Sequence, residues 1–279
     1  MNLPNPVTAP RTYLFVPANR PERYAKALAS GADAVVIDLE DAVADAAKAA
    51  ARDALANWAA TASPADRARA AVRINAAGSA FHADDLRLLR ETGLGLVMLA
   101  KAEAVEQLAA AAHHLPGARF LALIESARGV AEVDAIACCA GVERLVFGTL
   151  DLALDLELDI ATGSDGLSHA ASRLVLASRV AGLASPVSGV TPQIDDEARL
   201  LADLAWSRRH GLHARLCIHP RQIAPIHAAL APSGDALAWA RRVLEAEAAS
   251  PGAAQLDGRM IDRPVVLQAQ RTLQRGGLA

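Results

Sequence analysis

Eight short apolar segments recur along this chain, separated by stretches with helical periodicity. The apolar segments are Thr12–Val16, Ala34–Asp38, Ala71–Asn75, Leu96–Leu99, Phe120–Glu125, Arg144–Gly148, Val187–Val190 and Leu216–His219. The stretches between them include Arg20–Ser30, Asp45–Thr61, Asp84–Thr92 and Asp195–His210. Eight strand–helix units in about 250 residues predict an α/β fold, a closed (β/α)8 TIM barrel, in preference to an open doubly wound sheet.

Glycine positions support this prediction. Gly31, Gly93, Gly141 and Gly211 each follow a helical stretch and precede a strand, where a left-handed C-cap residue is expected. Pro17-Ala18-Asn19-Arg20 follows the first strand, where a Rossmann fold would have a glycine-rich phosphate loop. A nucleotide-binding Rossmann fold is therefore disfavoured.

Composition excludes several classes of partner. Lys+Arg 28 nearly balances Asp+Glu 31, and no basic stripe is interleaved with aromatic residues, so nucleic acid is not an expected partner. No apolar stretch reaches the ~18 residues of a membrane span, and Met1–Pro6 is not a signal sequence, so we expect a cytoplasmic protein without membrane contact. Cys138, Cys139 and Cys217 match no disulfide or metal-binding pattern and are expected to be buried small hydrophobes.

The second strand runs directly into three carboxylates. Asp38 lies inside the apolar run that begins at Val35, where an unpaired carboxylate would be costly to bury. Glu40 and Asp41 follow it, and a site at the carboxyl end of a buried strand would explain all three. The alternative is that Asp41 caps the next helix and that Glu40 is a solvated charge in its first turn.

Lysine is rare here, because Lys26, Lys48 and Lys101 are the only three lysines in a chain with 28 basic residues. A lysine retained in such a composition is a candidate for a specific role. Lys101 follows the fourth strand, where its ammonium can act as a point charge near an anion.

Polar residues stand at the ends of the predicted strands, which converge on one mouth of a barrel. Beyond those of the second strand, they are Arg73, Asn75, Lys101, Glu125, Thr149 and Asp151. Glu125 and Asp151 form the best pair of metal ligands, because carboxylates from neighbouring strands can hold Mg²⁺ and leave positions for water and a chelating substrate. The alternative is that Glu125 is a helix N-terminal charge and that Asp151 caps a helix.

Two further strand-end residues allow two interpretations each. The guanidinium of Arg73 suits bidentate recognition of a substrate carboxylate, and it also suits a structural ion pair with Asp38; both can hold. His219 could be a base, but the buried segment before it and Pro220 after it favour an imidazole fixed by local hydrogen bonds.

Six motifs, in order and spacing over nearly the whole chain, resemble the citrate lyase beta-subunit-like group of the HpcH/HpaI aldolase family. They are Arg11–Pro17, Arg20–Arg23, Asp38–Val43, Val72–Asn75, Ile124–Val130 and Cys217–Gln222. The resemblance implies a Mg²⁺-dependent (β/α)8 enzyme, usually a homotrimer or a multiple of one. Such an enzyme makes or breaks a carbon–carbon bond between a 2-oxo acid and an acyl-CoA, as in malyl-, citramalyl- or citryl-CoA.

The resemblance also implies roles for individual residues. Glu125 and Asp151 would bind the metal, and Arg73 would bind the carboxylate of the acid. Asp38, Glu40, Asp41 and Lys101 would support this site, amides near Gly148 and Thr149 would stabilise developing charge, and Arg20 and Lys26 would lie near the CoA phosphates.

The C-terminal segment Gly258–Pro264 resembles a tail that crosses to a neighbouring subunit in malyl-CoA-type members. Asp262 is the candidate acid/base carboxylate of that tail, and the alternative is a turn residue before Arg263. We expect a barrel catalytic domain over residues 1–230 and a C-terminal helical extension over 231–279.

Departures from the family pattern leave the substrate open. Ala100 stands where a proline is usual, Leu150 stands where an asparagine is usual, and Asp155–Asp159 lacks an expected glycine. Besides the CoA-thioester lyase, or a related condensing or thioester-hydrolysing enzyme, two alternatives stay open. One is a metal-dependent aldolase for free 2-oxo acids, and the other is a citrate lyase beta subunit that acts with an acyl carrier protein.

Overall fold

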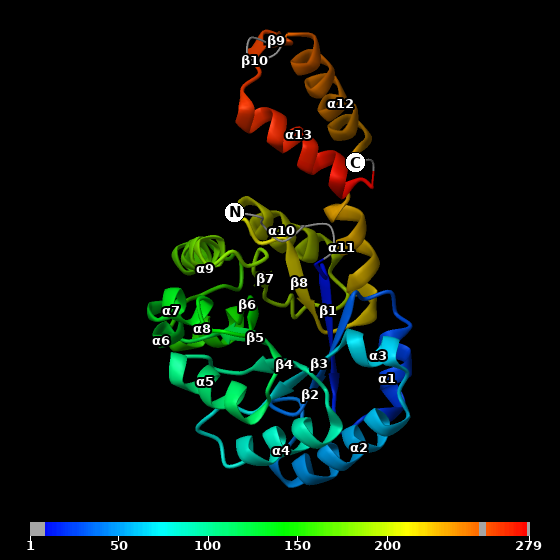
Figure 1. Cartoon of the computed structure of the whole chain (residues 1–279), viewed down its shortest axis with the longest axis vertical. Coiled ribbons are helices and arrows are strands. Elements are labelled where there is room, and N and C mark those ends of the chain that lie inside the picture. Colours follow the sequence, from blue (N-terminus) through cyan, green and yellow to red (C-terminus); the bar gives the residue numbers. More distant parts are fainter. Residues whose placement is uncertain (1–8, 251–254, 278–279) are drawn as a thin grey trace. The chain divides into compact units, whose positions relative to one another are not determined.

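The computed structural model describes residues 9–250 and 255–277. Contacts divide the chain into two compact units, one covering Pro10–Ile226 and the other running from His227 onward. The division falls inside helix α11 (Ile223–Leu230), and the predicted domain boundary after residue 230 lies at the end of that helix. Figure 1 shows the course of the chain through both units.

The first unit is built on a closed barrel of eight strands, which confirms the predicted (β/α)8 architecture. Each strand pairs in parallel with the next, and β8 pairs with β1. The strands are β1 (Thr12–Pro17), β2 (Ala34–Asp38), β3 (Ala70–Ile74), β4 (Leu96–Leu99), β5 (Arg119–Ile124), β6 (Val142–Phe147), β7 (Val187–Ser188) and β8 (Ala214–Cys217). In register, Asp38 lies beside Arg73 on the neighbouring strand.

Helices connect the strands and lie outside the ring that the strands form (Figure 1). The α-helices of this unit are α1 (Tyr24–Leu28), α2 (Lys48–Thr61), α3 (Pro64–Arg69), α4 (His82–Thr92), α5 (Val105–His114), α6 (Ala127–Ala131), α7 (Val133–Ala137), α8 (Thr149–Asp155), α9 (Ser168–Val180) and α10 (Glu197–Arg209). Short 3-10 turns are η1 (Pro21–Arg23), η2 (Asp45–Ala47), η3 (Asp165–Leu167) and η4 (Pro220–Gln222). The predicted left-handed glycines are confirmed, and Gly93, with φ 66°, is the C-cap of α4.

The barrel interior is filled by side chains that alternate along the strands. Tyr13, Val36, Met98 and Leu123 belong to this buried cluster, as do Ala214 and Leu216 on β8. Alternate residues of the same strands face the surrounding helices. The packed interior leaves the carboxyl ends of the strands as the place where polar side chains gather.

The expectation that all three cysteines are buried is wrong for Cys138. Cys217 is buried on β8, whereas Cys138 is exposed and Cys139 is half-buried. Helix α7 turns Val133, Ile136 and Ala137 inward, and Cys138 follows as its C-cap. No described helix has both the length and the apolar character needed to cross a membrane.

The second unit has its own small core. It contains α12 (Gly234–Ala249), the antiparallel pair β9 (Gln255–Leu256) and β10 (Arg259–Met260), and α13 (Arg263–Arg275). Ala240, Val243, Ile261, Ala269 and Leu273 form the buried cluster. The predicted helical extension thus consists of two helices joined by a short hairpin.

Candidate active site

Asp38 and Arg73 form a buried pair at the ends of β2 and β3. The Oδ1 of Asp38 accepts a hydrogen bond from Arg73 Nε at 2.7 Å, and its Oδ2 accepts one from Nη2 at 2.6 Å. The same two oxygens accept the main-chain N–H groups of Glu40 at 2.9 Å and Ala42 at 3.1 Å. The carboxylate therefore fixes both the guanidinium and the turn that leaves β2.

Glu40 and Asp41 gather on the other side of the same guanidinium. Glu40 Oε2 lies 2.8 Å from Arg73 Nη1, and Asp41 Oδ2 lies 3.6 Å from it. The pKa of Glu40 is raised to about 7, chiefly by burial and also by the charges of Asp41 and Asp38, while the charge of Arg73 opposes the shift. Neither carboxylate caps the following turn η2, whose N-cap is Ala44 without a side-chain hydrogen bond, so the capping alternative is wrong.

Arg73 is held by its surroundings in one orientation. Its guanidinium carbon lies 4.9 Å from the ring centroid of Phe15 on β1. Burial would lower the pKa of Arg73, but the hydrogen bonds to Asp38 and the charges of Asp38, Glu40 and Asp41 raise it overall. The ion pair with Asp38 is therefore formed, and it leaves a charged guanidinium at the mouth of the barrel.

Glu125 follows β5 and is buried, with 4% of its surface exposed. Its Oε1 accepts the main-chain N–H of Lys101 at 2.8 Å. The pKa of Glu125 is raised to about 8, chiefly by burial and also by the charges of Glu40 and Asp151, while the hydrogen bond from the Lys101 N–H and the charge of Arg73 act to lower it. Glu125 directly precedes Ser126, the N-cap of α6, which accepts the Gly129 N–H at 3.2 Å, so the helix-charge alternative fits its position, while its carboxylate is bound by the Lys101 N–H.

Lys101 supports the site through its backbone. Its φ of 48° is the left-handed conformation, which is uncommon for a residue with a side chain, and it presents the N–H to Glu125. The Lys101 side chain is exposed. The sequence indicated an ammonium near an anion, whereas the contact that the structure shows is an amide hydrogen bond.

Gly148 brings β6 against Glu125. A Cβ at Gly148 would lie 2.4 Å from Glu125 Cβ, so only glycine fits there without displacement. The N–H of Gly148 donates to Ile124 O at 2.9 Å, so this one of the amides expected near Gly148 and Thr149 already has a backbone partner. Helix α8 begins at the next residue, with Thr149 buried and Asp151 half-buried in its first turn.

The donor set at this mouth suits a hard divalent cation. Glu125 and Asp151 supply carboxylate oxygens on neighbouring elements, and their charges act on each other. Glu40 Oε2 is buried and has no directed hydrogen bond from the described residues. Among the residues that the structure describes, no group of three or more His, Cys, Asp or Glu side chains is arranged to hold a metal ion without further ligands. Two protein carboxylates with remaining positions for water or substrate match the coordination that Mg²⁺ usually has in enzymes.

The other predicted residues have local contacts of their own. Arg20 is exposed and lies 3.8 Å from Glu22, and Lys26 is exposed on α1. Asp262 belongs to the second unit, where it is the N-cap of α13 and accepts the Val265 N–H at 3.2 Å. His219 accepts the Arg221 N–H through Nδ1 at 3.2 Å, the local hydrogen bond that the sequence favoured.

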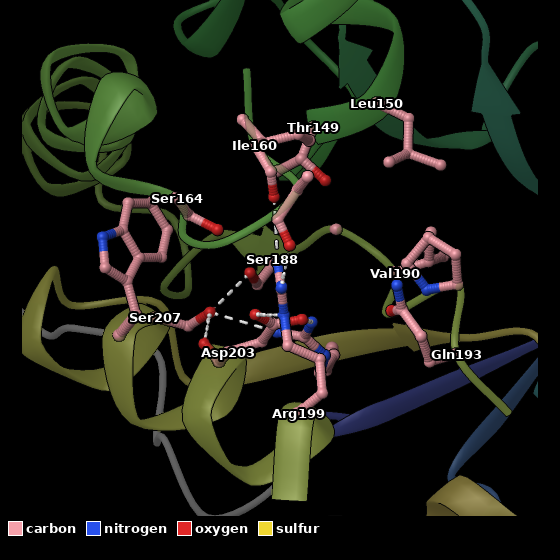
Figure 2. A pocket seen from close by; sticks show the side chains of 15 residues that line it. Thr149, Leu150, Ile160, Ser164, Ser188, Val190, Gln193, Arg199, Asp203 and Ser207 are labelled. Atoms are coloured by element: carbon pink, nitrogen blue, oxygen red, sulfur yellow. Dashed lines mark hydrogen bonds and ion pairs between the residues drawn. The ribbon is translucent and has the colours of Figure 1, made fainter. Parts of the chain in front are cut away.

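A pocket of about 140 Å³ lies beyond Thr149, beside β7 and α10. Figure 2 shows Thr149 and Ile160 on one side of it and Ser188, Asp203 and Ser207 on the other. A Cβ at Gly189 would lie 2.0 Å from Thr149 Oγ1, so this glycine allows the β7 loop to pass the start of α8. No sequence motif had indicated this pocket, because its lining comes from segments that are distant in the chain.

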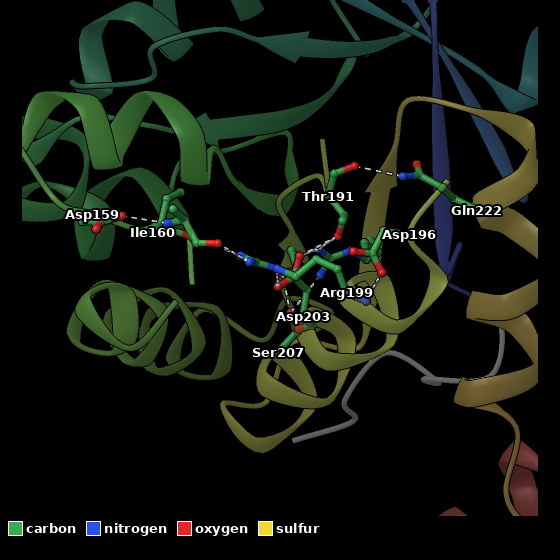
Figure 3. A network of polar contacts seen from close by, with 11 residues as sticks. Asp159, Ile160, Thr191, Asp196, Arg199, Asp203, Ser207 and Gln222 are labelled. Carbon is green, nitrogen blue, oxygen red and sulfur yellow. Dashed lines mark hydrogen bonds and ion pairs between the residues drawn. The ribbon is translucent and has the colours of Figure 1, made fainter. Parts of the chain in front are cut away.

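Several residues that line this pocket belong to a polar network, which Figure 3 shows. Arg199 donates through Nη1 and Nη2 to the carbonyls of Ala161 and Ile160, and through Nε to Asp203 Oδ1 at 2.8 Å. Buried Arg215 donates to Thr191 Oγ1 at 2.5 Å and to Asp203 Oδ2 at 3.3 Å. The network anchors the loop between α8 and α9 to α10.

Comparisons with known proteins agree with this geometry. A family model described as HpcH/HpaI aldolase/citrate lyase matches residues 11–220. The chain is 39% identical over 272 residues to the citrate lyase subunit beta-like protein of Mycobacterium tuberculosis, covering 96% of each. It is 30% identical over 269 residues to a (3S)-malyl-CoA thioesterase of Cereibacter sphaeroides, covering 95% of this chain and 94% of the relative.

A solved structure is similar over almost the full length. The crystal structure of protein CitE from Mycobacterium tuberculosis, in complex with magnesium, acetoacetate and coenzyme A, matches with a TM-score of 0.87 and 38% identity. The match covers 97% of this chain and 99% of that one.

Proposed function

The chain belongs to the HpcH/HpaI aldolase/citrate lyase family, and we propose that it is a Mg²⁺-dependent carbon–carbon lyase of the citrate lyase beta-subunit-like group. Its substrate is a 3-hydroxyacyl-CoA such as malyl-, citramalyl- or citryl-CoA, and its products are a 2-oxo acid and an acyl-CoA. The similar CitE structure, which contains magnesium, acetoacetate and coenzyme A, supports this choice of cofactor and substrate class.

One observation carries the proposal. Glu125 is a buried carboxylate whose Oε1 is fixed by the Lys101 N–H, and the charges of Asp151 and Glu40 both act on it. A cation bound between Glu125 and Asp151 would offset this repulsion. Such an arrangement is expected of a metal site and has no evident use in a purely structural barrel mouth.

Each residue at the mouth of the barrel has a separate role in the proposed reaction. Glu125 and Asp151 would hold the metal, and Mg²⁺ when bound supplies Lewis-acid stabilisation of charge on the substrate oxygen. Asp38 holds Nε and Nη2 of Arg73, while Glu40 and Asp41 lie 2.8 and 3.6 Å from Nη1, so Arg73 would bind the carboxylate of the acid at an Nη1 that it shares with these two side chains. Asp38, Glu40 and Asp41 hold that guanidinium in place. The start of α8 at Thr149 follows Gly148, which lies against Glu125.

Carbon–carbon cleavage also requires proton transfers. The hydroxyl of the substrate loses its proton, the bond to the carbon next to the thioester breaks, and that carbon then takes up a proton as the acyl-CoA forms. We assign this protonation to Asp262, contributed by the C-terminal unit of a neighbouring subunit in a homotrimer or a multiple of one. Exposed Arg20 and Lys26 would supply positive charge toward the CoA phosphates.

A coupled assay over a panel of 3-hydroxyacyl-CoA esters, with and without Mg²⁺, tests the proposal. Separate measurement of the 2-oxo acid and of free CoA thiol distinguishes a lyase from a thioesterase, the activity named for the Cereibacter relative. Glu125→Ala should abolish turnover through loss of bound metal, whereas Asp262→Asn should keep the metal and lower turnover. A Glu125→Ala protein with wild-type activity and metal content would refute the metal assignment.

Two alternative substrates have their own outcomes. Turnover of free 2-hydroxy-acid aldols without any CoA ester would indicate an aldolase for free 2-oxo acids. Turnover only with an acyl carrier protein, together with its capture in a pull-down, would indicate a citrate lyase beta subunit. Both outcomes leave the metal assignment intact and change the substrate class.

A further inference from the structure

One of the three lysines in the chain is buried beside the candidate site and has no role in the scheme above. Lys48 is the first residue of α2, and 4% of its surface is exposed. Its ammonium lies 5.2 Å from the ring centroid of Phe81. Among the described residues it makes no ion pair with a carboxylate. A charged side chain buried in this way is costly unless its protons are satisfied.

The protons of Lys48 are directed to the turn that carries the acidic cluster. Nζ donates to the carbonyl oxygen of Leu39 at 2.9 Å and to that of Glu40 at 3.0 Å. The ammonium thus binds two consecutive carbonyls, as a small cation would. The second of these carbonyls belongs to the residue whose side chain meets Arg73.

The same turn has a second anchor on the same face of α2. Arg52, four residues after Lys48, donates to Asp85 Oδ1 at 3.0 Å. Asp85 is fully buried, and its Oδ2 accepts the side-chain N–H of Asn75 at 2.6 Å. The Asn75 side chain also donates to Leu39 O at 3.0 Å, so this carbonyl receives hydrogen bonds from two sides.

We propose that Lys48 is a positioning residue for the substrate-carboxylate clamp, acting through the Leu39–Glu40 turn on Glu40 and through Glu40 on Arg73. The proposal rests on the proposed function for the identity of the clamped group. The Lys48 charge also offsets part of the negative charge of Asp38, Glu40 and Asp41, which Arg73 alone does not balance. Two carbonyls that converge without a cation would repel each other and would release the turn.

Lys48→Met tests the proposal, because methionine keeps most of the apolar stem and removes the ammonium. Arg67→Met is the matched control. Arg67 also donates to two main-chain carbonyls, those of Ala59 and Thr92, each at 2.5 Å, but it does so from α3, ahead of β3 and away from the strand ends. Both variants lose a cation that holds backbone carbonyls, so a general loss of stability affects both.

The measured quantities are the KM for the 2-oxo acid in the condensation direction and the Mg²⁺ affinity of the full-length protein. Both are measured at a temperature well below the thermal unfolding midpoint of each variant. Lys48→Met should raise the KM by about 10- to 100-fold, the usual effect of removing a partner that orients a ligand-binding group. It should leave Mg²⁺ affinity close to that of the wild type, and Arg67→Met should change neither. A wild-type KM in Lys48→Met would overturn the proposal.

Two further arms keep the test decisive. Lys48→Arg retains the charge but cannot direct one ammonium to both carbonyls, so this variant should raise the KM by a smaller factor. If Lys48→Met does not fold, Lys48→Arg takes its place in the test. A crystal structure of either folded variant should show Glu40 displaced from Arg73. If the wild type turns over no ester at all, the proposed function fails, and an unmoved Glu40–Arg73 pair in that crystal would separately refute the role of Lys48.

Discussion

Gly148 lies so close to Glu125 that a methyl group in its place would stand 2.4 Å from the Glu125 Cβ and 2.8 Å from its Oε2. The backbone at Gly148 has φ −80°, which any residue can adopt, so the requirement for glycine comes from this contact alone. The end of β6 therefore presses on the side chain that we assign as a metal ligand.

Gly148→Ala should reduce Mg²⁺ affinity, because the added methyl can be accommodated only by moving Glu125 or the β6 end. We expect a loss of about 10- to 100-fold, as for other changes that disturb ligand orientation. Calorimetric titration with Mg²⁺ measures it. Gly95→Ala is the control, because a Cβ there has no atom within 4 Å. Equal Mg²⁺ affinity in both variants would contradict the assigned contact.

Arg73→Met should destabilise the protein by about 3 kcal/mol, because it leaves Asp38 buried without its charged partner. It should also raise the KM for the 2-oxo acid. Arg173→Met removes an ion pair with Asp134 at the same kind of distance, 2.8 Å, but with side chains 34% and 69% exposed. We expect that control to cost less than about 1 kcal/mol. Urea unfolding at neutral pH compares the two variants, and similar losses would argue against burial as the cause.

Glu40 should make stability depend on pH between about 4.5 and 7. Its pKa is raised from 4.5 to about 7 on folding, so the folded protein binds this proton more tightly than the unfolded chain. Its contribution to stability is then fully present below pH 4.5 and is lost as pH rises through 7. Glu40→Gln cannot titrate and should flatten this part of the profile.

Unfolding free energies at several pH values, measured without divalent cations, check this prediction. Asp41→Asn is a useful comparison, because Asp41 is largely exposed and touches the same guanidinium. A Glu40→Gln profile that parallels the wild type from pH 4.5 to 7 would show that another group causes the dependence.

Gly189→Ala should disturb the pocket beside β7, since its Cβ would lie 2.0 Å from Thr149 Oγ1 and 2.9 Å from Thr149 Cβ. Overpacking of this kind typically costs about 1–3 kcal/mol. Gly163→Ala, with nothing within 4 Å of its Cβ, is the control in the neighbouring loop. Thermal unfolding midpoints of both variants provide the measurement. An unchanged midpoint for Gly189→Ala would show that the Thr149 side chain can move aside without a loss of stability.

The barrel could be predicted from the amino-acid sequence. Apolar segments such as Ala34–Asp38 and Leu96–Leu99 coincide with observed strands, because the local pattern and the helical stretches between strands are properties of neighbouring residues. The polar residues at strand ends were also recognisable, because a closed parallel barrel brings those ends together. Asp38, Arg73 and Glu125 were identified in this way.

The contacts that hold these groups in place became visible only in the folded chain. The amide of Lys101 on Glu125, the ammonium of Lys48 on two carbonyls and the contact of Gly148 with Glu125 join segments that are distant in the chain. None of these contacts can be recognised from neighbouring residues in the sequence. Whether a backbone amide reaches a carboxylate, or whether a position has room for a Cβ, depends on how whole strands are placed relative to one another. The sequence fixes which groups reach the mouth of the barrel, and packing fixes their orientation and charge.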